Sequence, residues 1–166
     1  MKKILIVDDE FLILYALSKT LIGDDREIIT ASNGRDALKE IGDHHYDLCL
    51  LDLHLPDMNG LDIMKKLREV SPATKIIIIT GAVITDVMMK SIQENAHLLL
   101  PKPFDLDQVK AAADRMLANT RPGFTAEATA LVDNEPLIQR FIKRVVTDNR
   151  DHGRRITVMP VAGLAR

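Results

Sequence analysis

Four short apolar runs in this chain each lead to a polar side chain, and this repeated pattern constrains the fold more than any other feature. Continuous apolar runs are typical of strands that are buried on both faces, as in a parallel sheet. The polar residues at the ends of the runs are Asp8 and Asp9, Asp52, Thr80 and Lys102. Ligands bind outside the carboxyl ends of the strands in an open parallel sheet, so these residues predict one site at that edge.

Helical patterns lie between the runs, so strands and helices alternate along the chain. We predict strands over 3–7, 27–31, 46–51, 75–79 and 97–100. We predict helices over 11–22, 34–42, 59–70, 84–94 and 105–118. This alternation indicates an α/β fold with a parallel sheet. The acidic residues can converge only if the first and third strands are neighbours in the sheet.

Four stretches of the sequence resemble the receiver domain of bacterial two-component response regulators. They are ILIVDDE (4–10), LLDLHLPDMNG (50–60), IIIITGA (76–82) and LLLPKPF (98–104). The resemblance covers residues 1–120. It implies a flavodoxin-like (βα)5 fold, in which a doubly wound parallel sheet has the order 2-1-3-4-5, followed here by a short C-terminal extension.

The resemblance implies that Asp52 is a phosphoacceptor in a two-component phosphorelay. The phosphoryl donor would be a phosphohistidine of a sensor histidine kinase or of a histidine phosphotransfer protein. A Mg²⁺ site is also implied, formed by Asp9, Asp52 and the main-chain carbonyl of His54, with Asp8 bound through water. Carboxylate and carbonyl oxygens are the ligands that this cation prefers. Taken alone, Asp8 and Asp9 would serve equally well as caps of the first helix.

The phosphoryl oxygens would bind the Thr80 hydroxyl, the backbone N–H of Ala82 and the ammonium group of Lys102. The Lys102–Pro103 bond is expected to be cis, as in the family. Thr80 would transmit the signal, but Leu99 occupies the position where relatives usually carry the Tyr or Phe of the switch, and leucine lacks their ring. We expect a signalling phosphoacceptor that assists its own phosphorylation and dephosphorylation, and not an enzyme with a separate substrate.

Charge and composition differ between the two parts of the chain. Residues 1–120 hold 14 basic and 19 acidic residues, whereas residues 121–166 hold 8 basic and 5 acidic residues. The single cysteine, Cys49, lies in an apolar run and fits a reducing compartment. No apolar stretch approaches the roughly 20 residues that cross a bilayer, and we see no signal-peptide pattern. We therefore expect a cytoplasmic protein without a membrane partner.

The tail, 121–166, is predicted to be a linker followed by an extension. Arg121, Pro122 and Gly123 break the last helix of the receiver. Residues 130–138 then echo residues 5–13, and 136–147 read as an amphipathic helix. This pattern suggests one strand and one helix of a truncated second receiver. Chance similarity over so short a stretch is the alternative.

The first predicted helix offers a surface for a protein partner. It opens with seven apolar residues, 11–17, although a helix with one buried face needs only an apolar stripe. We expect the excess to bind the kinase, as the resemblance implies, or a second copy of the chain in a homodimer.

Three classes of function compete. The first is the phosphoacceptor, which would act on a downstream protein target. The second is a DNA-binding regulator that uses the basic residues of the tail, Arg140, Lys143, Arg144, Arg150, Arg154 and Arg155. The tail lacks the pair of helices of a helix-turn-helix, so we do not expect a nucleic-acid partner. The third is a pseudo-receiver that only binds partners, and the complete set of acids argues against it.

Overall fold

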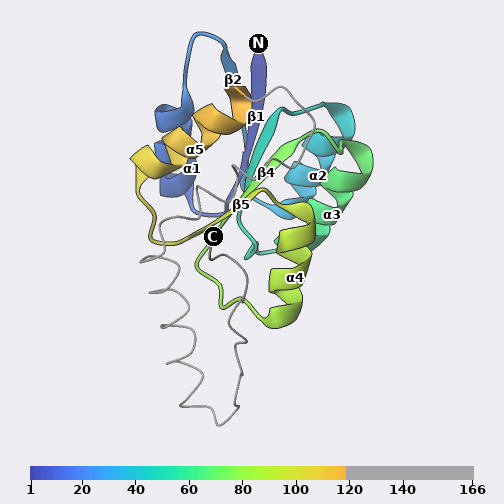
Figure 1. The fold of residues 1–166 in the computed structure, drawn as a ribbon. Helices are drawn as coiled ribbons and strands as arrows, with labels where there is room; N and C mark the ends of the chain where they lie inside the picture. The colour runs from blue at the N-terminus through green and yellow to red at the C-terminus, as the bar shows by residue number, and fades with distance from the viewer. Residues whose placement is uncertain (119–166) are drawn as a thin grey trace, which may run out of the picture. The chain divides into compact units, whose positions relative to one another are not determined.

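The computed structural model of the chain describes residues 1–118, which form a parallel sheet flanked by helices (Figure 1). The strands are β1 (Lys2–Val7), β2 (Arg26–Ala31), β3 (Leu48–Leu51), β4 (Lys75–Thr80) and β5 (Leu98–Pro101). Their order is β2-β1-β3-β4-β5, and all four pairings are parallel. The predicted fold class and strand order are confirmed. The predicted linker and extension, 121–166, lie outside the described residues.

The helices cover both faces of the sheet, as a doubly wound fold requires (Figure 1). On one face lie α1 (Phe11–Leu21) and α5 (Leu106–Ala118), and on the other lie α2 (Gly34–Asp43), α3 (Gly60–Val70) and α4 (Asp86–Asn95). Alternate residues of the central strands point to opposite faces. The core beneath α1 and α5 includes buried Ile4, Ile6, Leu48, Leu50, Ile77 and Ile79. Because β1, β3 and β4 are buried on both faces, they read as uninterrupted apolar runs.

Side-chain caps set where several helices begin. The Asn33 side chain accepts a hydrogen bond from the Asp36 N–H, and the Asn59 side chain accepts one from the Leu61 N–H. α4 begins two residues later than predicted, because Thr85 is its N-cap. The predicted start of the third strand was also two residues early, and β3 begins at Leu48. Within residues 1–118, no helix is long and apolar enough to cross a bilayer.

The loop after β3 is fastened to the N-terminus of α2 by Asp57. Its two carboxylate oxygens accept hydrogen bonds from the N–H groups of Gly34, at 2.7 Å, and Arg35, at 2.9 Å. These bonds lower the pKa of Asp57. A Cβ on Gly34 would overlap the Met58 side chain, so the loop packs closely against α2. The segment that follows Asp52 is therefore held against the N-terminus of α2.

Arg68 and His97 join the elements at the opposite edge of the sheet. The Arg68 guanidinium donates to the carbonyl oxygens of Asn95, at 2.6 Å, and Thr74, at 2.8 Å. It also donates to Nδ1 of His97, which in addition accepts the N–H of Ile76 at 3.1 Å. Because Nδ1 accepts two hydrogen bonds, the His97 ring is neutral in this arrangement. Arg68 thereby connects the C-terminal ends of α3 and α4 to the start of β4.

We expect the protein to become less stable as the pH is lowered, because His97 then becomes protonated. Burial, followed by the charges of Arg68 and Lys75, lowers the pKa of His97 from 6.5 to about 4. The unfolded chain then binds more protons in this range, so stability is complete above pH 6.5 and is lost as the pH falls to 4. Because His97 is only partly buried, the loss should be about 1–2 kcal/mol in the free energy of unfolding from urea denaturation. His97→Asn keeps an acceptor but does not titrate, so its pH profile should be flatter; parallel profiles would contradict the assignment.

Candidate functional site

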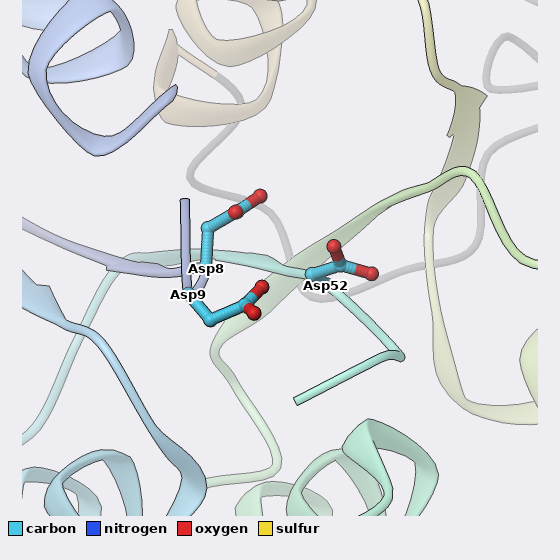
Figure 2. A group of neighbouring side chains, drawn as sticks. All are labelled: Asp8, Asp9 and Asp52. Carbon is cyan, nitrogen blue, oxygen red and sulfur yellow. The ribbon is translucent and has the colours of Figure 1, made fainter. Parts of the chain in front are cut away.

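Three carboxylates meet at the carboxyl edge of the sheet (Figure 2). Asp8 and Asp9 follow β1, and Asp52 follows β3. The two strands are neighbours in parallel register, and the Asp52 N–H donates to the carbonyl oxygen of Val7 at 2.9 Å. One carboxylate oxygen from each acid lies within 4.8 Å of the others. The predicted convergence of the acids is confirmed.

The three acids differ in burial and in hydrogen bonding. Asp8 and Asp52 are buried, whereas Asp9 is exposed. Burial raises the pKa of Asp8, although hydrogen bonds from Lys102 and from the N–H of Glu10 oppose that shift. Asp52 accepts the N–H of His54 at one oxygen, at 3.0 Å, and Lys102 Nζ at the other, at 2.7 Å. The least constrained carboxylate is thus that of Asp9.

Lys102 brings a positive charge to the centre of the acidic group. Its Nζ lies 2.7 Å from Asp52 Oδ2, 2.8 Å from Asp8 Oδ2 and 2.9 Å from Glu10 Oε1. Burial lowers the pKa of the ammonium group, but the hydrogen bonds to Asp52, Asp8 and Glu10 outweigh it, so the net shift is upward. Lys102 therefore stays charged. The Lys102–Pro103 bond is cis, as predicted.

Thr80 and Ala82 form the neighbouring wall of the site. Thr80 is buried at the end of β4, and its Oγ1 accepts the N–H of Ala82 at 3.2 Å. The carbonyl oxygen of Thr80 accepts the N–H of Lys102 at 2.8 Å. The two side chains expected to bind a phosphoryl group therefore come from adjacent strands. The hydroxyl and the amide that would bind its oxygens are at present bonded to each other.

His54 and Leu99 lie outside this central group. His54 is exposed, and its backbone N–H is bonded to Asp52. Leu99 is partly buried on the edge strand β5 and is paired with Ile78. Glu10 is the residue that the sequence reasoning missed. The motif DDE contained a signal for it, because a third acid directly follows the pair at the strand end.

The donor atoms at this edge fit a magnesium ion. All three side chains supply carboxylate oxygens, and their mutual distances are compatible with a single cation. Lys102 provides part of the compensating charge. With a cation held by the acids, the ammonium group of Lys102 and the hydroxyl of Thr80 suit binding of an anionic phosphoryl group.

Comparison with known proteins identifies relatives of this chain among transcriptional regulators. The transcriptional regulatory protein ZraR of Escherichia coli (strain K12) is 27% identical over 148 residues, which cover 86% of this chain and 34% of that protein. The DNA-binding transcriptional regulator NtrC of the same strain is 31% identical over 114 residues, covering 69% of this chain and 24% of that protein. The chain thus spans about a third or less of these relatives. The match to ZraR continues past the described residues.

Solved structures of response regulators and receiver domains are also similar to this chain. The response regulator protein TrrA from Thermotoga maritima, solved in complex with Mg(2+)-BeF, is 34% identical, with a TM-score of 0.61 over 70% of this chain and all of that chain. A CheY-like receiver domain protein from Methanospirillum hungatei is 27% identical, with a TM-score of 0.67 over 71% of this chain and 94% of that chain. The family model described as the response regulator receiver domain matches residues 4–114. The match covers more than half of the chain, which therefore belongs to the family of response regulator receiver domains of two-component systems.

Proposed function

We propose that Asp52 accepts a phosphoryl group from the phosphohistidine of a sensor histidine kinase or a histidine phosphotransfer protein. The observation that carries this proposal is the contact of the buried Asp52 carboxylate with Lys102, 2.7 Å away, at the carboxyl edge of the sheet. A bond forms between a carboxylate oxygen and phosphorus while the P–N bond of the donor breaks. A carboxylate can act as such a nucleophile when charge on the transferred group is neutralised nearby.

The surrounding residues have separate roles in this reaction. Lys102 pairs with Asp52 before transfer and binds a phosphoryl oxygen afterwards. Asp9, Asp52 and the main-chain carbonyl of His54 would hold Mg²⁺, and Asp8 would hold it through water. When bound, Mg²⁺ supplies positive charge for the phosphoryl oxygens.

Signalling would begin with Thr80. Its hydroxyl and the N–H of Ala82 bond each other in the structure. A phosphoryl group on Asp52 would draw both groups toward its oxygens, and the start of the β4–α4 connection would move with them. Leu99 would occupy the position of the Tyr or Phe that usually accompanies this movement in the family, but it has no aromatic ring. The altered surface would bind a downstream protein, so the receiver is a phosphoacceptor and not an enzyme with its own substrate.

The exposed apolar side chains of α1 support a protein partner for this site. Phe11, Leu12 and Tyr15 are more than half exposed, as the excess of apolar residues in this segment predicted. α1 starts directly after the acids, so this patch adjoins the phosphoacceptor. We propose that the phosphodonor protein binds here, and a second copy of the chain is the alternative. Cys49 is buried and free, which fits the reducing cytoplasm in which we expect such donors.

A second candidate output, DNA binding, has one observation in its favour. The ZraR match of 148 residues extends beyond the receiver, so part of the tail corresponds to a segment that follows the receiver in that transcriptional regulator. This correspondence is an alternative to the truncated second receiver. A duplex-DNA affinity that falls steeply with salt would favour the DNA-binding reading over the protein target.

The phosphoacceptor is tested with beryllofluoride, an analogue of the aspartyl phosphate. With Mg²⁺ present, we expect the amide NMR signals of Thr80 and Ala82 to shift in the parent and to stay unchanged in Asp52→Asn. Acetyl phosphate should label the parent and leave the variant at background, a loss greater than about 100-fold because no other carboxylate replaces the nucleophile. Asp62→Asn, which removes an exposed acid of α3, serves as the control and should behave like the parent. An equal response in Asp52→Asn would refute the assignment.

A further inference from the structure

Glu10 lies between helix α1 and the acidic site, and its side chain is directed to the site. Glu10 is the N-cap residue of α1, where an acid ordinarily stabilises the helix N-terminus. Within residues 1–118, however, its side chain makes no capping hydrogen bond. Its Oε1 instead lies 2.9 Å from Nζ of Lys102, a residue 92 positions away. The carboxylate therefore contributes to the site in place of capping its own helix.

The contact with Glu10 completes the hydrogen bonding of the Lys102 ammonium group. An ammonium group has three N–H donors, and Asp52, Asp8 and Glu10 supply one acceptor each, at 2.7, 2.8 and 2.9 Å. Lys102 can therefore bind a phosphoryl oxygen only if one of these contacts opens. The side chain of Glu10 is 59% exposed, against 5% for Asp52 and 3% for Asp8. Because water can solvate the released carboxylate, the Glu10 contact costs least to break.

We propose that Glu10 is a positioning residue that holds one donor of Lys102 in the unphosphorylated receiver and thereby opposes occupation of the site by a phosphoryl group. This inference rests on the proposed function. A phosphoryl group adds negative charge beside Lys102. The carboxylate of Glu10 repels this charge, and it also competes with the phosphoryl group for the ammonium group of Lys102. Both effects weaken binding of the phosphoryl group. The side chain at position 10 thus sets how readily the site fills and how readily it empties.

The test is the affinity of Glu10→Gln for beryllofluoride at saturating Mg²⁺. Binding is monitored through the amide NMR signals of Thr80 and Ala82. Glutamine keeps the size of the side chain and removes its charge. We expect about three- to tenfold tighter binding than in the parent, as for the loss of one like charge near the protein surface. The gain should shrink at about 1 M salt, where the screening length is roughly 3 Å. Asp62→Asn is the matched control, because it removes an exposed acid that has no side-chain partner among the described residues.

A second measurement needs neither metal nor anion. In the metal-free protein, the ammonium protons of Lys102 should exchange with water faster in Glu10→Gln than in the parent, since one of their three acceptors has lost its charge. A role of Glu10 confined to the stability of α1 would leave this exchange rate unchanged.

The outcomes separate this inference from the proposed function. If the parent itself shows no beryllofluoride response, the phosphoacceptor proposal fails. If the parent responds and Glu10→Gln binds with equal or weaker affinity, the role of Glu10 is overturned while the phosphoacceptor stands. Tighter binding that is insensitive to salt and is matched by Asp62→Asn would also overturn it, because the effect would not come from a charge near Lys102.

Discussion

Lys102→Met should reduce the rate of phosphorylation of Asp52 by acetyl phosphate about 10²–10³-fold, which is the usual loss when one preorganised donor is removed from developing negative charge. Methionine retains most of the length of the side chain but has no charge. In the structure the ammonium group lies within 2.9 Å of Asp8, Glu10 and Asp52. Without it, the charge on the transferred group lacks a partner, and the pKa of buried Asp8 rises further because a hydrogen bond that lowers it is lost.

The measurement is the initial rate of labelling at saturating Mg²⁺, with the fold of the variant checked by circular dichroism. Lys110→Met is the matched control. Lys110 pairs with Asp114 at 3.6 Å within α5 and is not among the partners of the acidic site, so its loss should leave the rate unchanged. A rate within about threefold of the parent in Lys102→Met would show that this charge does not assist transfer.

The sheet and the central site could be predicted because their signals lie in single segments of sequence. The runs that end at Asp8, Asp52 and Thr80 are apolar because their strands are buried on both faces. Parallel strands place their carboxyl ends at one edge, so residues that are distant in sequence had to converge there. The order of the strands came from the resemblance, and the structure confirms it.

The contacts that could not be predicted join side chains of different elements. The pairing of Glu10 with Lys102 depends on the position of α1 relative to β5, and neither local pattern contains that information. The same holds for Asp57, which caps a helix 22 residues earlier in the chain. No local pattern in the sequence marks Arg68 and His97 as hydrogen-bond partners. Their hydrogen bonds become apparent only when the ends of α3, α4 and β4 lie together.

Gly60 illustrates a constraint of space at the phosphoacceptor, and Gly60→Ala should lower the free energy of unfolding by about 2–4 kcal/mol. A Cβ at this position would overlap the carbonyl oxygen of Asp52 and would lie 2.7 Å from Cα of Leu53. Both are backbone atoms, so no flexible side chain can move aside. The strain must be relieved by displacing the segment that carries Asp52 or the first turn of α3, whose N-cap is Asn59.

Gly42→Ala is the matched control, because the same methyl group added near the end of α2 meets no atom of the described residues within 4 Å. Its free energy of unfolding should be unchanged or raised by up to about 1 kcal/mol, since alanine has the higher helix propensity. Urea denaturation measures both variants. Displacement of Asp52 in Gly60→Ala should also weaken beryllofluoride binding, whereas Gly42→Ala should bind like the parent. If the two variants lose stability equally, the close approach of α3 to the Asp52 carbonyl is not what requires glycine at position 60.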